Sequence, residues 1–89
     1  WFDVVIASNL FEDVLSDLGP AVVGGMGIAP GGNINPEKKF PSMFEPVYGS
    51  EPNIAGKKWA NTIACNWTAA MIQDHLGETE GAKLIDNAT

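Results

Sequence analysis

The stretch from residue 8 to residue 18, Ser-Asn-Leu-Phe-Glu-Asp-Val-Leu-Ser-Asp-Leu, predicts the start of the helix around which the chain is organised. Asn9 suits the N-cap, because its side-chain oxygen can accept a hydrogen bond from a free backbone N–H one turn into the helix. Glu12 follows three residues later, where its carboxylate can reach back as in a capping box. At about 100° per residue, one arc of this helix is apolar and consists of Leu10, Phe11, Val14, Leu15 and Leu18.

Two aspartates, Asp13 and Asp17, lie four residues apart at the edge of this apolar arc, beside Leu10. Residues with that spacing are neighbours on one helix face. Two neighbouring carboxylates repel each other, and a divalent cation with a preference for oxygen ligands offsets the repulsion. An acid pair at this spacing is more often part of a solvated helix face than a metal site. The spacing alone therefore leaves a metal site and a solvated face as open interpretations.

The sequence around the acid pair resembles a signature of the β-decarboxylating dehydrogenases, the family of isocitrate, isopropylmalate and tartrate/D-malate dehydrogenases. The family pattern is a strand, then Asn, an apolar pair, Gly-Asp, two apolar residues and Ser-Asp. It is matched by residues 2–17, Phe-Asp-Val-Val-Ile-Ala-Ser-Asn-Leu-Phe-Glu-Asp-Val-Leu-Ser-Asp. A second signature follows at residues 44–50, Phe-Glu-Pro-Val-Tyr-Gly-Ser, and the linker at 29–42 is most similar to the tartrate/D-malate branch.

This resemblance covers essentially the whole chain and implies a fold. The expected fold is the three-layer α/β/α arrangement of an isocitrate/isopropylmalate dehydrogenase-like domain. Because the chain begins at Trp1 directly before a strand and ends inside a helical pattern, we expect residues 1–89 to be a single partial domain. By resemblance they form a segment of the C-terminal half of such a domain.

The resemblance also implies a reaction, in which a 2-hydroxy acid is oxidised by hydride transfer to NAD and, for most substrates, loses its β-carboxylate as carbon dioxide. Asp13 and Asp17 match the two family acids that hold Mg²⁺ or Mn²⁺, and a third acid comes from the facing subunit of a homodimer. The family's catalytic Tyr and Lys and its substrate-binding arginines have no counterpart here, so we expect no catalytic residues in this segment and no turnover by it alone. Tartrate or D-malate is the first choice of substrate, and 3-isopropylmalate the second.

Residues 48–61 form a predicted loop of small and polar residues that, by resemblance, wraps the adenosine end of the dinucleotide. The cofactor-binding positions so implied are Glu45, Tyr48, Gly49, Ser50, Glu51, Asn53, Ile54 and Asn61. Without the resemblance, a segment of this composition favours an ordinary surface turn.

The loop departs from the family pattern at several positions. Tyr48 stands where His is usual, Glu51 where a small residue is usual, Asn53 where NAD-dependent members carry Asp, Lys58 for Gly and Thr62 for Pro, and outside the loop Glu12 replaces Gly. Asn53 carries no charge to repel a 2′-phosphate, but Glu51 can restore the repulsion, which favours NAD. Because the loop departs from the family pattern at so many positions, an alternative stays open. The chain would then be a diverged non-catalytic paralogue, subunit or gene fragment without tight dinucleotide binding. A protein-interaction module is a third, weaker alternative.

Composition narrows the remaining function classes. The 89 residues carry a formal net charge of −6, which argues against nucleic acid and anionic membranes as partners. No apolar run approaches the roughly 20 residues of a membrane span, so a cytoplasmic protein is expected. The single cysteine, Cys65, excludes an internal disulfide and is expected to be a buried, inert thiol.

Hydrophobic periodicity predicts the other elements. A buried strand is expected at 4–7. The helix that follows it is expected to weaken or kink at Gly19-Pro20 and then to continue for a turn or two. A short strand is expected at 26–29 and an exposed loop at 30–41. A second helix is expected at 63–76, with Ile63, Trp67, Ala70 and Met71 on its core face and Gly77 just beyond its end. A last helix from about Glu78 is expected to bury Leu84 and Ile85.

Overall fold

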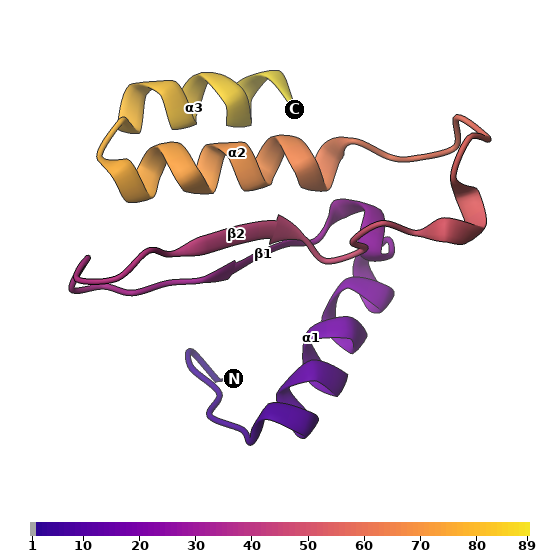
Figure 1. Cartoon of the computed structure of the whole chain (residues 1–89), viewed down its shortest axis with the longest axis horizontal. Helices are drawn as coiled ribbons and strands as arrows, with labels where there is room; N and C mark the ends of the chain where they lie inside the picture. The colour runs from indigo at the N-terminus through magenta and orange to yellow at the C-terminus, as the bar shows by residue number, and fades with distance from the viewer. Residues whose placement is uncertain (1) are drawn as a thin grey trace.

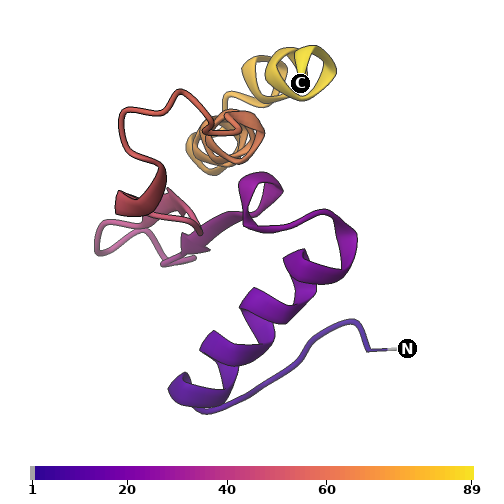
Figure 2. The same ribbon diagram turned by 90° about the vertical axis from the view of Figure 1, so that its right-hand side faces the viewer.

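The computed structural model describes residues 2–89, in which helices and strands are mixed as in an incomplete α/β domain. The elements in order are α1 (Asn9–Val23), the 3₁₀ turn η1 (Met26–Ile28), β1 (Pro30–Asn33), β2 (Met43–Pro46), the 3₁₀ turn η2 (Pro52–Ile54), α2 (Ile63–Leu76) and α3 (Thr79–Ala88). The β1–β2 hairpin lies between α1 on one side and the α2–α3 pair on the other (Figures 1 and 2). The three-layer arrangement of a whole domain stays a prediction.

The two strands form an antiparallel hairpin in which Gly32 pairs with Phe44. A Cβ atom at Gly32 would lie 2.9 Å from a Phe44 ring carbon and 3.3 Å from the terminal methyl of Met71 in α2. Real Cβ contacts are longer than the first of these distances, so only glycine fits between the ring and the helix without a shift. Gly32 is therefore where the hairpin and α2 come into close contact.

Small side chains make up the core. Helices α2 and α3 lie side by side (Figure 1), and α2 also packs on both strands. The buried side chains among the described residues are Ala29, Ala64, Thr68, Ala70 and Ala82. The Thr68 hydroxyl donates to the Ala64 carbonyl at 2.7 Å, which satisfies its polar group inside the core.

The sequence predicts the bounds of α2 correctly. Its predicted core face is confirmed, since Ala70 is buried and Ile63, Trp67 and Met71 are partly buried. Gly77 follows the helix with a φ of 89°, a left-handed conformation that glycine adopts without a Cβ penalty.

Two side-chain predictions for the helices are wrong. Cys65 is exposed, and Leu84 keeps 71% of its surface in α3, where the buried residue is Ala82. Ile85, the other residue predicted to be buried in this helix, is partly buried.

The segment before α1 forms no strand in residues 2–8, contrary to the prediction for residues 4–7. A strand buried on both faces needs neighbouring strands and layers, and neither β1 nor β2 pairs with this segment. The helix begins at Asn9, with Ser8 at the N-cap, and no side chain caps it. Asn9 as N-cap and the capping box are therefore also wrong; the Glu12 backbone N–H donates to the Ser8 carbonyl at 2.9 Å instead.

Helix α1 continues through Pro20 to Val23, as predicted. It ends where the N–H groups of Gly24 and Gly25 both donate to the Pro20 carbonyl, at 3.1 and 2.7 Å. A short strand at 26–29 is wrong, because residues 26–28 form η1, and the loop predicted from residue 30 begins as β1.

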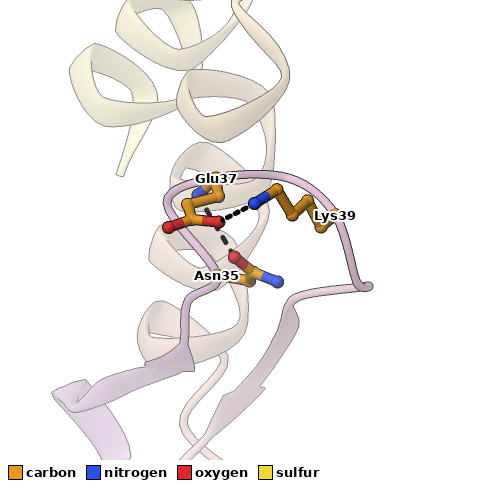
Figure 3. A network of polar contacts seen from close by, with 3 residues as sticks. All are labelled: Asn35, Glu37 and Lys39. Atoms are coloured by element: carbon orange, nitrogen blue, oxygen red, sulfur yellow. Dashed lines mark hydrogen bonds and ion pairs between the residues drawn. The ribbon is translucent and has the colours of Figure 1, made fainter.

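The turn that joins β1 to β2 is fastened to the end of α2. Lys38 Nζ donates to the His75 carbonyl at 2.7 Å, and Ser42 Oγ lies 3.1 Å from His75 Nε2. Within the turn, the Asn35 side chain accepts from the Glu37 N–H at 3.1 Å and Lys39 pairs with Glu37 at 2.7 Å (Figure 3).

In the described part of the chain, no helix is long and apolar enough to cross a membrane.

Candidate functional site

An open cleft of about 710 Å³ lies between α1 and the hairpin. Four acidic residues line it, and we call it the acid cleft: Glu12, Asp13 and Asp17 from α1, and Glu45 from β2. The hairpin wall includes the two glycines Gly31 and Gly32. The cleft therefore has three acids on its α1 wall and one acid, Glu45, on its hairpin wall, with room for a small polar molecule between them.

The structure brings Asp13 and Asp17 to the same cleft, as their spacing predicts. Residues at i and i+4 share a helix face, and here that face is turned toward the hairpin. Ser16 also lines the cleft, and its hydroxyl donates to the Asp13 carbonyl at 3.2 Å, within the helix. Asp13 and Asp17 thus both line the cleft, and neither takes part in a salt bridge recorded among the described residues.

This donor set fits a divalent cation in part. Carboxylate oxygens are the ligands that Mg²⁺ and Mn²⁺ prefer. Among residues 2–89, no group of three or more His, Cys, Asp or Glu side chains is arranged to hold a metal ion. The chain can therefore contribute two acids, and the other coordination positions would need water, substrate or groups from elsewhere.

Glu12 and Glu45 occupy positions that sequence reasoning did not assign. Glu12 was expected to cap α1, but no side chain caps this helix and Glu12 lines the acid cleft. Glu45 was expected with the cofactor loop, but it lines the same cleft from the strand just before that loop. Because Glu45 precedes Tyr48 by three residues, β2 connects the acid cleft to the loop.

A second cavity, of about 360 Å³, lies inside the loop at 48–61 and is called here the loop cavity. Its lining residues are Gly24, Met26, Gly27, Tyr48, Glu51, Ile54, Trp59, Ala60 and Asn61. Of the predicted cofactor residues, the structure brings together Tyr48, Glu51, Ile54 and Asn61. The other three in the loop, Gly49, Ser50 and Asn53, do not line this cavity.

Sequence reasoning missed five contributors to the loop cavity, Gly24, Met26, Gly27, Trp59 and Ala60. Trp59 was available as a signal, because a large aromatic ring in a polar loop is unusual. Met26 and Gly27 come from η1, more than 20 residues earlier in the chain, and no local pattern links them to the loop. A Cβ atom at Gly27 would lie 3.0 Å from the Asn61 Cβ, so the absence of a side chain there lets η1 approach the loop closely.

The loop backbone holds two non-glycine residues in the left-handed region. Glu51 has a φ of 35° and Lys58 a φ of 60°. Both stand where the family resemblance implies a small residue or glycine, and a side chain in this conformation costs about 1–2 kcal/mol. The loop therefore keeps the backbone path that glycine would favour, at a cost in stability.

Comparison with known proteins finds a matching family and several relatives of this chain. The isocitrate/isopropylmalate dehydrogenase family model matches residues 1–89. The chain is 57% identical over 86 residues to a probable tartrate dehydrogenase/decarboxylase of Bacillus subtilis, covering 96% of this chain and 24% of that protein. It is 64% identical over 76 residues to the D-malate dehydrogenase (decarboxylating) of Escherichia coli, covering 85% of this chain and 21% of that protein.

A third relative is the 3-isopropylmalate dehydrogenase of Thermobifida fusca, with 53% identity over 87 residues, 98% of this chain and 25% of that protein. The chain thus spans about a quarter of the length of the curated relatives that it matches.

Proposed function

The chain belongs to the isocitrate/isopropylmalate dehydrogenase family, and from this membership we propose that it is part of a metal- and NAD-dependent oxidoreductase acting on a malate-like 2-hydroxy acid. The reaction is oxidation, followed for most substrates by decarboxylation. Tartrate or D-malate is the first choice of substrate and 3-isopropylmalate the second, as the names of the relatives suggest. The observation that carries the proposal is the acid cleft, where Asp13 and Asp17 face the strand that leads into the loop at 48–61.

Asp13 and Asp17 would hold Mg²⁺ or Mn²⁺ in this cleft. When bound, such an ion supplies Lewis acidity, which eases loss of the substrate hydroxyl proton and stabilises the negative charge that decarboxylation leaves. The two aspartates fix its position because α1 carries both of them on one face. Gly31 and Gly32 in the hairpin wall would leave room for substrate on the other side of the cleft.

The loop cavity would take part of NAD. The lining by Tyr48, Glu51, Ile54 and Asn61 supports this role, because four predicted cofactor positions share one cavity. Glu45 lies instead at the acid cleft, so we propose that it contacts the dinucleotide near the reacting end. The continuous path from Glu45 to Tyr48 would align cofactor and substrate.

The active unit in this proposal is a homodimer with a shared site. The apolar arc of α1 has no cover within the described residues, and Leu10 keeps 70% of its surface exposed. An exposed apolar stripe of this kind is typical of an interface. A facing subunit over α1 would also bring a further acid toward Asp13 and Asp17.

The test replaces the metal acids one at a time in the full-length protein. Asp13→Asn and Asp17→Asn should each weaken Mn²⁺ binding by at least about 100-fold, since even loss of an outer-shell partner costs 10–100-fold. Activity with D-malate or tartrate should fall in parallel. The matched control is Glu12→Gln, which removes a neighbouring acid of the same cleft and should change Mn²⁺ affinity less than about threefold.

Calorimetric titration with Mn²⁺ measures the affinity for the metal ion, and initial rates at saturating Mn²⁺ measure the activity. If both aspartate variants kept wild-type affinity and turnover, the metal assignment would be wrong. An equal loss in Glu12→Gln would show that only the summed charge of the cleft matters.

A second candidate is a non-catalytic paralogue, subunit or gene fragment that keeps the fold without tight dinucleotide binding. The observation that favours it is the strained loop backbone at Glu51 and Lys58. NADH titration separates the two functions. An active enzyme should bind NADH well below millimolar concentration, whereas no binding at that concentration would favour the non-catalytic function.

A further inference from the structure

Glu12 lines the acid cleft, and no structural role among the described residues uses its side chain. It lies in the first turn of α1, yet no side chain caps this helix. Neither salt bridge recorded in residues 2–89 includes Glu12, and the described residues that line the cleft include no lysine, arginine or histidine. The Glu12 carboxylate is therefore available to accept a hydrogen bond from a molecule bound in the cleft.

Glu12 belongs to a different row of α1 from the two aspartates. Residues four apart lie above one another on a helix, so one row consists of Glu12, Ser16 and Pro20 and the next of Asp13 and Asp17. All five residues line the acid cleft. The Ser16 hydroxyl donates back into the helix at the Asp13 carbonyl, and the proline side chain is apolar. Glu12 thus carries the charge of its row, directly beside the proposed metal acids.

The side chain at position 12 makes this part of the cleft narrower and more polar than the family pattern implies. That pattern has glycine before the first aspartate, whereas this chain has Glu12. The apolar end of the cleft, at Val23 and Ile28, is further away. At 1.5 Å of rise per residue, Val23 lies about 9 Å beyond Asp17 along the helix. A group of the substrate close to the metal acids therefore meets Glu12 rather than the apolar end.

The candidate substrates differ at the position where this contact matters. In the proposed reaction the metal ion activates the substrate hydroxyl, so the carbon that bears it lies beside Asp13 and Asp17. The adjacent carbon carries a hydroxyl in tartrate, only hydrogen in D-malate and an isopropyl group in 3-isopropylmalate. A hydroxyl can donate to the Glu12 carboxylate, whereas an isopropyl group would displace water from the carboxylate without replacing its hydrogen bonds.

We infer that Glu12 is a specificity-determining residue that selects a 2-hydroxy acid with a second hydroxyl on the adjacent carbon over one with an apolar branch there. The inference rests on the proposed function. A site built to hydrogen-bond a substrate hydroxyl rejects analogues that lack it, because its polar group is left unpaired. The expected order of preference is tartrate, then D-malate, then 3-isopropylmalate.

The kinetic experiment compares these three substrates in full-length protein at saturating Mn²⁺ and NAD. In Glu12→Ala the ratio of kcat/KM for tartrate to that for D-malate should fall by at least about 10-fold, because a hydrogen bond to a charged group is lost. Glu12→Gln keeps an oxygen acceptor and should lose less. The control is Glu80→Ala, which removes an acid from the first turn of α3, outside the cleft, and should keep the wild-type ratio.

Binding without turnover gives a second readout. Calorimetric titration with tartrate and with D-malate, in Mn²⁺ and without NAD, measures affinity for each acid. Glu12→Ala should weaken tartrate binding by about 10-fold. It should leave D-malate binding unchanged or tighter, because a less negative cleft repels the substrate carboxylates less. A loss of Mn²⁺ affinity of 10-fold or more in Glu12→Ala would make Glu12 a metal ligand and would overturn the inference.

The remaining outcomes separate the inference from the function on which it rests. If Glu12→Ala and Glu12→Gln keep the wild-type ratios and affinities, or if the wild type prefers 3-isopropylmalate to tartrate, the inference is overturned while the proposed function stands. If the full-length wild type binds no Mn²⁺ and oxidises none of the three acids, the proposed function fails and the inference fails with it.

Discussion

Glu51 is the residue at which the choice between NAD and NADP can be tested. From the sequence, Asn53 was expected to matter most, with Glu51 in support. In the structure Glu51 lines the loop cavity and Asn53 does not. If adenosine occupies this cavity, the Glu51 carboxylate repels a 2′-phosphate, and a repulsion of about 1.4 kcal/mol corresponds to a tenfold preference.

We therefore expect Glu51→Gln to lower the ratio of NAD to NADP catalytic efficiency by about 10-fold at low salt. The preference is measured as the ratio of the kcat/KM values for NAD and NADP. Glu80→Gln, which removes an acid on α3, serves as the control. If Asn53→Asp changed the ratio while Glu51→Gln did not, the discrimination would belong to residue 53.

Lys58 tests the cost of the loop backbone. Its φ is 60°, a conformation that costs a side-chain-bearing residue about 1–2 kcal/mol. Lys58→Gly removes this strain of about 1–2 kcal/mol, but it also increases the conformational entropy of the unfolded chain, which costs about 0.4–1 kcal/mol. The variant should therefore be more stable by up to about 1.6 kcal/mol. Thermal unfolding of the full-length protein measures the gain. The neighbouring Lys57 has no positive φ, and Lys57→Gly should lower the melting temperature; a fall in both variants would show that strain at residue 58 is not the cause.

The contact between the hairpin and α2 depends on Gly32. Gly32→Ala would place a methyl group 2.9 Å from the Phe44 ring and 3.3 Å from Met71, and overpacking of this kind costs about 1–3 kcal/mol. Gly81→Ala is the matched control: its methyl meets only the flexible end of Gln73, at 2.9 Å, inside α3. There the better helix propensity of alanine, about 0.5–1 kcal/mol, should offset the contact. Chemical denaturation should show Gly32→Ala destabilised and Gly81→Ala at or above wild type.

The elements that the sequence predicts well are those whose causes are local. Helix α2 has its apolar period and its terminal Gly77 within one stretch, and Asp13 and Asp17 share a cleft because four residues make about one helical turn. The errors have non-local causes. Residues 4–7 read as a buried strand, but a strand needs a partner, and residues 30–33 read as a loop although the β2 strand pairs with them.

The residues of the candidate site can also be divided into those that could be assigned from the sequence and those that depend on non-local contacts. The family resemblance assigned Tyr48, Glu51, Ile54 and Asn61, and the structure gathers these four into one cavity. Met26 and Gly27 could not be assigned, because they reach the cavity only through the turn that follows α1. Glu45 could not be separated from the loop, because only the hairpin geometry shows that its strand borders the acid cleft.

At the scale of the whole molecule, the exposed arc of α1 decides whether one copy is enough. All five apolar residues of the arc are exposed within the chain, and the most covered of them, Leu15, still keeps 48% of its surface. Burying a leucine side chain is worth about 1.5–3 kcal/mol. An arc of several such residues can therefore supply the apolar centre of an interface between two copies.

On this basis Leu15→Asp in the full-length protein should raise the dimer dissociation constant by at least about 100-fold, because a carboxylate would lose its hydration in an apolar contact. Activity should fall with the dimer fraction if the site is shared, and sedimentation velocity over a range of concentrations measures both species. Leu15→Met keeps the volume and the apolar character, so it should stay dimeric and active. A Leu15→Asp protein that remained dimeric would place the interface elsewhere, whereas an active monomer would show that the acids on α1 need no residue from a second copy.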